Sequence, residues 1–205
     1  MMLSAMADDF YIQESQEYAY GVSRMIGSIG VLKLPITIHA GCRSEKLTPT
    51  LYNAFDYFDD IDYSTNPFTD CKRVIGILPD TMNYYCFVCI CPDTEDQYVY
   101  ILTFDKNYHL LDKKNITTHS DWDVVSYVVS NENYVSIDSS LNILYHFNFV
   151  TYYADVDDDT ILDSLAHNAP VEDLNIVHFE NRGKIANNGY ILYDIKNEID
   201  MSNMH

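Results

Sequence analysis

Residues 72–105 read KRVIGILPDTMNYYCFVCICPDTEDQYVYILTFD. β-Branched and aromatic residues fill the runs 72–78, 84–91 and 97–105, and both segments between these runs contain proline and aspartate. Apolar runs separated by turn residues at about ten-residue spacing are typical of antiparallel strands joined by hairpins. The stretch therefore predicts a three-stranded antiparallel meander.

The same pattern continues downstream and predicts the fold class. We expect further strands at 109–112, 123–130, 134–138, 142–153, 175–180 and 190–195. The segments 105–107 and 181–183 contain Asn and Gly, which tolerate the backbone of tight turns. The chain is therefore expected to be mainly β, an antiparallel meander of seven or more strands with one to three short helices, mostly N-terminal. Hairpin spacing does not choose among a sandwich, a barrel and a curved sheet.

The N-terminal part has a more mixed pattern. Thr48 and Pro49 read as the N-cap and first residue of a short helix that continues to Phe58, and acidic residues precede a second short helix at 160–165. Residues 8–30 are ambiguous, because apolar residues at helical spacing are interrupted by glycines. The run 32–38 contains Pro35 and suits an edge strand. We expect one domain over 1–205, with a segment 1–60 packing on a β body at 72–195.

The charge of the chain limits its partners. Among the 205 residues, 12 Lys and Arg stand against 31 Asp and Glu, a net charge of −19. A field of this sign repels phosphate backbones and anionic lipids, so neither nucleic acid nor a membrane is expected as a partner. The N-terminus has no basic, apolar signal pattern, and five cysteines indicate a reducing compartment. We expect a cytoplasmic protein; an exported protein whose signal was removed is the alternative.

Three cysteines, Cys86, Cys89 and Cys91, lie within one apolar run. A Cys-x-x-Cys spacing is found in zinc sites and redox pairs. In a strand, however, alternation sends Cys86 to one face and Cys89 to the other, so the two cannot share a metal. We expect buried core cysteines.

Carboxylates at 155–163 resemble a calcium-binding loop. Asp155, Asp157, Asp159 and Asp163 match its first, third, fifth and ninth positions. The sixth position, however, is Thr160 in place of glycine, and no glutamate closes the loop. We expect no metal and no cofactor, with calcium at these four aspartates as the alternative.

Catalytic motifs are missing from the sequence. His39 and Cys42 are close enough in sequence to form a base and a nucleophile, but no third orienting group is evident. Glycine-rich phosphate loops and nucleophile elbows are also absent. The expected protein is not an enzyme, with a hydrolase using Cys42 and His39 as an alternative.

The acidity is concentrated in one interval. No Lys or Arg occurs between Lys114 and Arg182. Tyrosine anchors combined with carboxylates are what a binder of a basic protein presents. The expected partner-binding residues in this interval are Trp122, Tyr127, Tyr145, Tyr152, Asp155, Asp157 and Asp158.

One predicted hairpin resembles a segment found in known proteins. The segment 101–112, which contains Thr103-Phe104-Asp105-Lys106, resembles a hairpin of small uncharacterised β-rich proteins of Bacteroides-like bacteria. The segments 34–38 and 181–185 are similar to other parts of that pattern. Asn107 and Tyr108 replace the glycine-bearing turn usual there, and the lipoprotein signal of exported members is absent. The resemblance implies a β-rich fold and brings no catalytic residue.

These observations together lead to a functional hypothesis. Small size, strong acidity, tyrosine-rich strands and missing catalytic motifs indicate a non-enzymatic protein that sequesters a basic protein partner, such as a bacterial immunity protein that neutralises a toxin. The alternative from another class is a surface or periplasmic β-protein that binds glycan or calcium.

Overall fold

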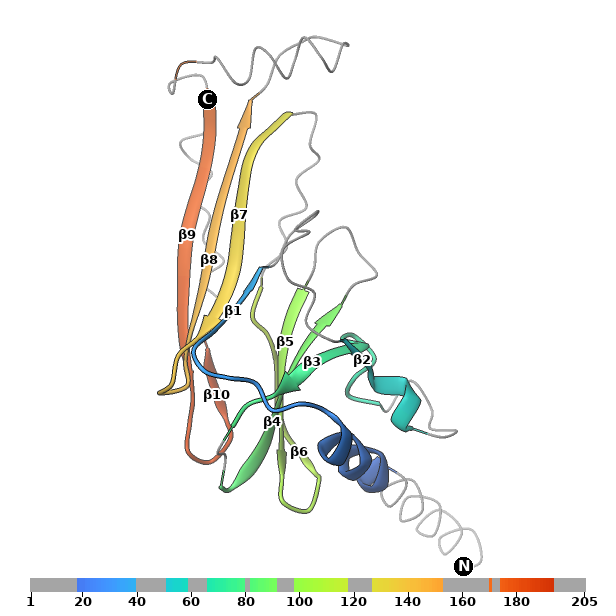
Figure 1. Cartoon of the computed structure of the whole chain (residues 1–205). Coiled ribbons are helices and arrows are strands. Elements are labelled where there is room, and N and C mark those ends of the chain that lie inside the picture. Colours follow the sequence, from blue (N-terminus) through green and yellow to red (C-terminus); the bar gives the residue numbers. More distant parts are fainter. Residues whose placement is uncertain are drawn as a thin grey trace, which may run out of the picture.

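The computed structural model describes residues 18–39, 51–58, 66–79, 82–91, 98–117, 127–152, 170 and 174–193. Ten strands among these residues form two antiparallel sheets of five strands each (Figure 1). Helical residues 18–28 and the 3-10 helix η1 (Ala54–Tyr57) accompany them. The expected mainly β, antiparallel class is therefore confirmed. Of the sandwich, the barrel and the curved sheet, the structure has the sandwich, in which two sheets pack on each other.

Sheet A contains the predicted meander. Its strand order is β2-β3-β4-β5-β6, in which each strand follows its neighbour in the chain. The strands are β2 (Tyr52–Asn53), β3 (Arg73–Ile77), β4 (Tyr84–Cys91), β5 (Tyr98–Asp105) and β6 (Leu110–Asn115). β4 and β5 pair along their whole length, from Tyr84 opposite Asp105 to Cys91 opposite Tyr98. The quoted stretch thus forms the centre of this sheet.

Sheet B combines distant parts of the chain in the order β1-β7-β8-β9-β10. Its strands are β1 (Ile36–His39), β7 (Tyr127–Ile137), β8 (Asn142–Tyr152), β9 (Leu174–Ile185) and β10 (Ile191–Tyr193). The edge strand expected at 32–38 is found as β1, which pairs with the end of β7. β7 is one continuous strand, so the expected break between 130 and 134 is wrong.

The turn predicted at 181–183 is also wrong, because β9 continues through it to Ile185. Gly183 serves a close approach there: a Cβ atom on it would lie 2.5 Å from Cδ2 of Tyr193 on the neighbouring strand. The chain turns instead at 186–189, where Gly189 has a φ of +88°. A glycine is needed at both places, once for space and once for backbone conformation.

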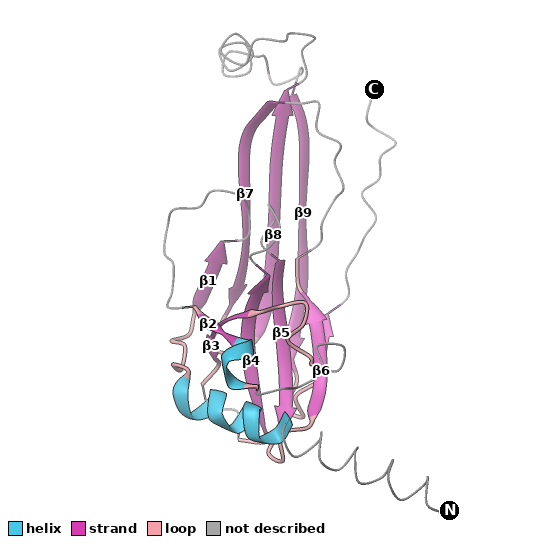
Figure 2. Ribbon diagram, turned by 90° about the vertical axis from the view of Figure 1, so that its right-hand side faces the viewer, coloured by secondary structure: helices cyan, strands magenta, loops and turns pink. Residues whose placement is uncertain are grey.

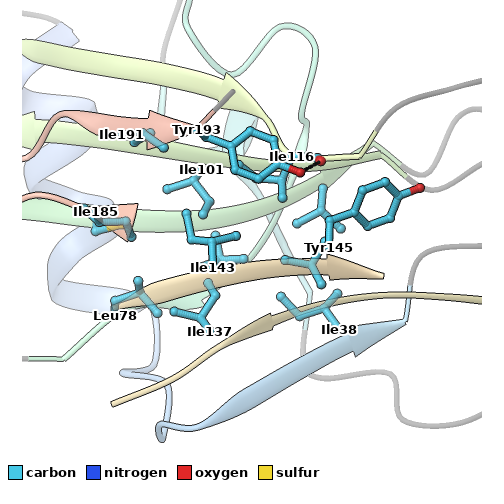
Figure 3. Close-up of a cluster of buried hydrophobic side chains, with 14 of the residues drawn as sticks. Ile38, Leu78, Ile101, Ile116, Ile137, Ile143, Tyr145, Ile185, Ile191 and Tyr193 are labelled. Carbon is cyan, nitrogen blue, oxygen red and sulfur yellow. Dashed lines mark hydrogen bonds between the residues drawn. The ribbon is translucent and has the colours of Figure 1, made fainter. Parts of the chain in front are cut away.

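The two sheets pack face to face around one core. Alternate residues of β4 and β5 face sheet B, and alternate residues of β8 face sheet A, as the period of a strand requires. Figure 3 shows isoleucines from both sheets interleaved with Tyr145 and Tyr193. The Tyr193 hydroxyl donates a hydrogen bond of 2.7 Å to the carbonyl oxygen of Ile116, which ties the two sheets together.

A second core lies on the outer face of sheet A. Val22 and Met25 of helical residues 18–28, and Ile29 directly after them, pack with Phe87 and Cys89 in one buried cluster. The ambiguous segment 8–30 is therefore helical from 18 to 28, with its apolar face on the sheet, and residues 8–17 lie outside the described residues. Cys86 and Cys89 point to opposite faces and are both fully buried, as predicted.

The helix predicted from Thr48 to Phe58 is not formed in its described part. Tyr52 and Asn53 are strand β2, paired with β3, and only the single 3-10 turn of η1 follows. The Asn53 side chain accepts a hydrogen bond from the Phe55 N–H and donates one to Asp56, which caps the short turn. Residues 48–49 and the helix expected at 160–165 lie outside the described residues.

The three central strands of sheet B are long. β7, β8 and β9 have 11, 11 and 12 residues, whereas no strand of sheet A exceeds 8. Figures 1 and 2 show these three strands running well beyond sheet A. Across them, Tyr127 lies opposite Tyr152, and Tyr152 lies opposite Leu174, so all three end together. We call this the distal end. No described helix has the length and apolarity needed to cross a membrane.

Candidate functional site

The distal end is where the acidic part of the sequence joins the fold. Residues 118–126 lead into β7, and the chain from 153 to 173 connects β8 to β9. These two connecting segments contain nine carboxylates and no Lys or Arg: Asp121, Asp123, Asp155, Asp157, Asp158, Asp159, Asp163, Glu172 and Asp173. Seven of these nine carboxylates lie in the sequence between Tyr152 and Leu174, which end β8 and begin β9 at the distal end, and the other two lie in the segment that leads from β6 into β7.

An aromatic row leads from the core toward this end on the inner face of sheet B. Phe147 stacks on Phe179 with ring centroids 4.8 Å apart, and Phe149 follows at 6.1 Å from Phe147. Tyr145 contacts Phe179 at 5.7 Å and begins the row inside the core. Phe149 and Phe179 remain half-buried. The row therefore extends the inter-sheet core along β8 and β9 with rings that pack against it.

The outer face of sheet B holds a polar cluster. The strand register aligns His39, Tyr134, His146 and Glu180 in one row across four strands. The Tyr134 and His146 rings stack at 4.7 Å, and the His178 ring approaches His146 edge-on at 5.0 Å. His146 Nδ1 lies 3.6 Å from Glu180 Oε1, too long for a hydrogen bond, and among the described residues this buried nitrogen has no partner within bonding distance.

Glu180 is the electrostatic centre of this cluster. Arg182 donates a hydrogen bond of 2.9 Å to its carboxylate, and this contact, together with the nearby His146, holds the pKa of Glu180 below its usual range. The carboxylate is thus ionised at neutral pH and neutralised locally by Arg182. Glu180 and Arg182 therefore form an ion pair on the outer face of sheet B.

The predicted tyrosine anchors have different positions. Tyr145 is 1% exposed in the core between the sheets, so its prediction as a contact residue is wrong. The reason is alternation: Tyr145 shares the inner face of β8 with Ile143 and Phe147. Tyr152 is half-buried at the distal end, and the backbone of Tyr127 pairs with it there.

Several predicted residues lie outside the described part of the chain. They are Trp122, Asp155, Asp157, Asp158, Asp159, Asp163 and Cys42. His39 is described: it is exposed at the end of β1, with its ring 6.2 Å from that of Tyr134. The outer-face cluster around His146 was missed, because the alternation of β8 places His146 on a polar face but does not reveal its neighbours on other strands.

Metal-binding groups and pockets are the two features that could indicate a reactive site. Within the described ranges, no group of three or more His, Cys, Asp or Glu side chains is arranged to hold a metal ion. A pocket of about 460 Å³ lies beside helical residues 18–28, where Lys113 spans it in an ion pair of 2.7 Å with Asp70. Its remaining lining is Tyr18, Asn66, Pro67, Thr69 and Leu110, which contain neither a nucleophile–base pair nor a carboxylate pair.

The chain was compared with protein-family models, with curated proteins and with solved structures, and no match was found in any of the three.

Proposed function

We propose that this protein is a non-enzymatic binder that sequesters a basic protein partner at the distal end of β7, β8 and β9, in the manner of an immunity protein that neutralises a toxin. The observation that carries the proposal is that acidic segments of the chain are attached to the end of the three long strands. The strands that project beyond sheet A end together, and the segments tethered there contain only acidic charges.

Charge of one sign at one end of a molecule favours capture of an oppositely charged protein. A surface of this kind accelerates association and orients the encounter, and this effect falls steeply with ionic strength. The half-buried Tyr152 and the half-buried Phe149 supply aromatic area near the end of β8, from which the acidic segment 153–173 continues in the sequence. Aromatic anchors surrounded by charged groups are the usual composition of a tight protein interface.

Affinity capture from the native host tests the proposal. The full chain is immobilised, and a lysate is applied at about 50 mM and about 500 mM salt, conditions that differ about threefold in screening length. We expect a basic protein to be retained in stoichiometric amount at low salt and to be released or weakened at high salt. Retention of no protein at low salt would contradict the proposal.

A further inference from the structure

The outer face of sheet B changes from polar to apolar along β8 and β9. Near the middle of these strands it holds the polar cluster around His146. At the distal end, four apolar residues on this face form two adjacent cross-strand pairs, Val150 opposite Ile176 and Tyr152 opposite Leu174. Residues directly opposite each other share one face of a sheet, and so do residues two apart on one strand. We call these four residues the outer distal patch.

The outer distal patch is more accessible than the inner face beside it. It lies where β8 and β9 run beyond sheet A (Figures 1 and 2). Ile176 is 53% exposed, and the other three residues of the patch are half-buried. Thr151, which follows Val150 and therefore faces the inner side, is only 8% exposed. Adjacent apolar side chains that remain accessible beside polar residues are typical of a surface that binds another protein.

Polar residues border the patch on the side toward the middle of the strands. Glu132, Asn148 and His178 form the next row of the same face across β7, β8 and β9. Glu132 and His178 are exposed, and Asn148 is half-buried. An apolar centre with a polar, solvent-accessible rim is the usual anatomy of a protein interface. The outer face at the distal end has both parts.

The charge attached to the patch has one sign. The segment 153–173 joins Tyr152 to Leu174, two residues of the patch, and it contains seven carboxylates and no Lys or Arg. The first Lys or Arg of β9 is Arg182, whose charge is paired with Glu180. A partner that complements this charge carries Lys or Arg next to the apolar groups that contact the patch.

We propose that the outer distal patch is the surface on which the protein partner docks, and that the partner presents an apolar group flanked by Lys or Arg side chains. Ile176, the most exposed of the four residues, is the main anchor. The acidic segment speeds association, and the apolar contacts slow dissociation. This inference rests on the proposed function, since the partner is the basic protein proposed there, and it adds the face of sheet B and the chemistry of the partner's contact surface.

Two neutral substitutions at exposed apolar positions supply a matched comparison. Ile176→Ser changes the outer distal patch, whereas Leu192→Ser changes a 63% exposed position on the outer face of β10. Isothermal titration calorimetry with the captured partner should give a Kd at least about tenfold weaker for Ile176→Ser and nearly unchanged for Leu192→Ser. The ratio of the Kd values at high and low salt should equal that of the wild type for both variants, because neither substitution changes the charge.

The outcomes separate this inference from the proposed function. If a basic protein is retained but Ile176→Ser binds it like the wild type, or both variants are weakened equally, the docking face is wrong and the proposed function stands. If no basic protein is retained, the proposed function fails. A synthetic probe then decides whether the patch can bind the stated chemistry.

The probe is a short peptide of leucine and lysine, and its control is a peptide of the same length and charge made of serine and lysine. Nuclear magnetic resonance on the isotope-labelled full chain reports where each peptide binds. We expect the leucine-containing peptide to shift the amide signals of Val150, Tyr152 and Ile176, and the serine-containing peptide to leave them unchanged. Equal shifts with both peptides, or no shifts at these three residues, would overturn the patch as a docking surface.

Discussion

Tyr193 and Ile116 join the two sheets by a hydrogen bond of 2.7 Å from the Tyr193 hydroxyl to the Ile116 carbonyl oxygen. Tyr193 is 7% exposed and Ile116 is fully buried. Burial raises the pKa of the Tyr193 hydroxyl, so it remains a protonated donor across the physiological range. The contact therefore anchors the short strand β10, and with it the end of sheet B, to the residue that directly follows β6 of sheet A.

Tyr193→Phe tests this anchor. The change removes the donor and leaves the Ile116 carbonyl oxygen buried without that partner, so we expect a loss of about 1–3 kcal/mol in the free energy of unfolding. Urea unfolding followed by circular dichroism measures it. Tyr190→Phe on the neighbouring, 50% exposed position is the control and should be nearly neutral. Equal stability of Tyr193→Phe and the wild type would contradict the assignment.

Phe68→Ala tests the second core. Phe68 is fully buried, stacks on Phe104 at 5.8 Å and meets the edge of Phe87 at 5.7 Å. We expect a loss of about 3–5 kcal/mol, the usual cost of removing a buried ring. Leu192→Ala, at a 63% exposed position, should change stability by less than about 0.5 kcal/mol. If both variants lose the same stability, the outer face of sheet A is not a packed core.

The hydrogen bonds of the Asp138 carboxylate predict that the stability of the fold depends on pH. Its carboxylate accepts hydrogen bonds from the Asn142 side chain and from the backbone N–H groups of Asn142 and Ser140, and these lower its pKa. A lowered folded-state pKa stabilises the fold above the unfolded value of about 3.9, and this stabilisation is lost as the pH falls through the folded-state pKa.

Melting temperatures of Asp138→Asn and the wild type check this dependence. We expect the variant to melt lower at pH 7 and the difference to shrink below about pH 4. Ser139→Ala, at an exposed position of the same turn, should melt like the wild type at both values. A difference that is constant with pH would show that the charge of Asp138 has no part in the turn.

Cys86 and Cys89 should be inert in the folded protein. Both are fully buried, and burial raises the pKa of both thiols above the usual value. Because only the thiolate reacts, neither should be labelled by Ellman's reagent at pH 8 until the chain is unfolded in guanidinium. Peptide mass spectrometry after labelling distinguishes them from Cys91, which is half-buried. Native labelling of Cys86 would contradict its position between the sheets.

The strands could be predicted from the sequence because alternation and turn residues are local properties. Alternation along a strand puts Ile143, Tyr145 and Phe147 on one face of β8. It could not tell which face another sheet covers, so Tyr145 was expected at the surface although it is buried. The pairing of β1 with β7, which brings Ile36 opposite Ile137, joins segments about a hundred residues apart. No local pattern determines such a register.

The His146 cluster and the distal end depend on the same long-range registers. His146 meets Tyr134 and Glu180 only because β7, β8 and β9 align them in one row. In the same way, the acidic interval is evident in the sequence, but its attachment to one end of three long strands is not. The acidic charge can be recognised in the sequence, whereas the strands to which the acidic segments are attached follow from the sheet topology.

Binding of the captured partner by charge-matched variants tests the central proposal most directly. One variant carries Asp155→Asn, Asp157→Asn and Asp158→Asn, in the connection tethered to the distal end, and the other carries Asp56→Asn, Asp59→Asn and Asp60→Asn, in or next to η1. Both lose the same charge. Isothermal titration calorimetry at low salt should give a Kd at least about tenfold weaker for the first variant and nearly unchanged for the second. Equal weakening by both variants, or by neither, would contradict binding at the distal end.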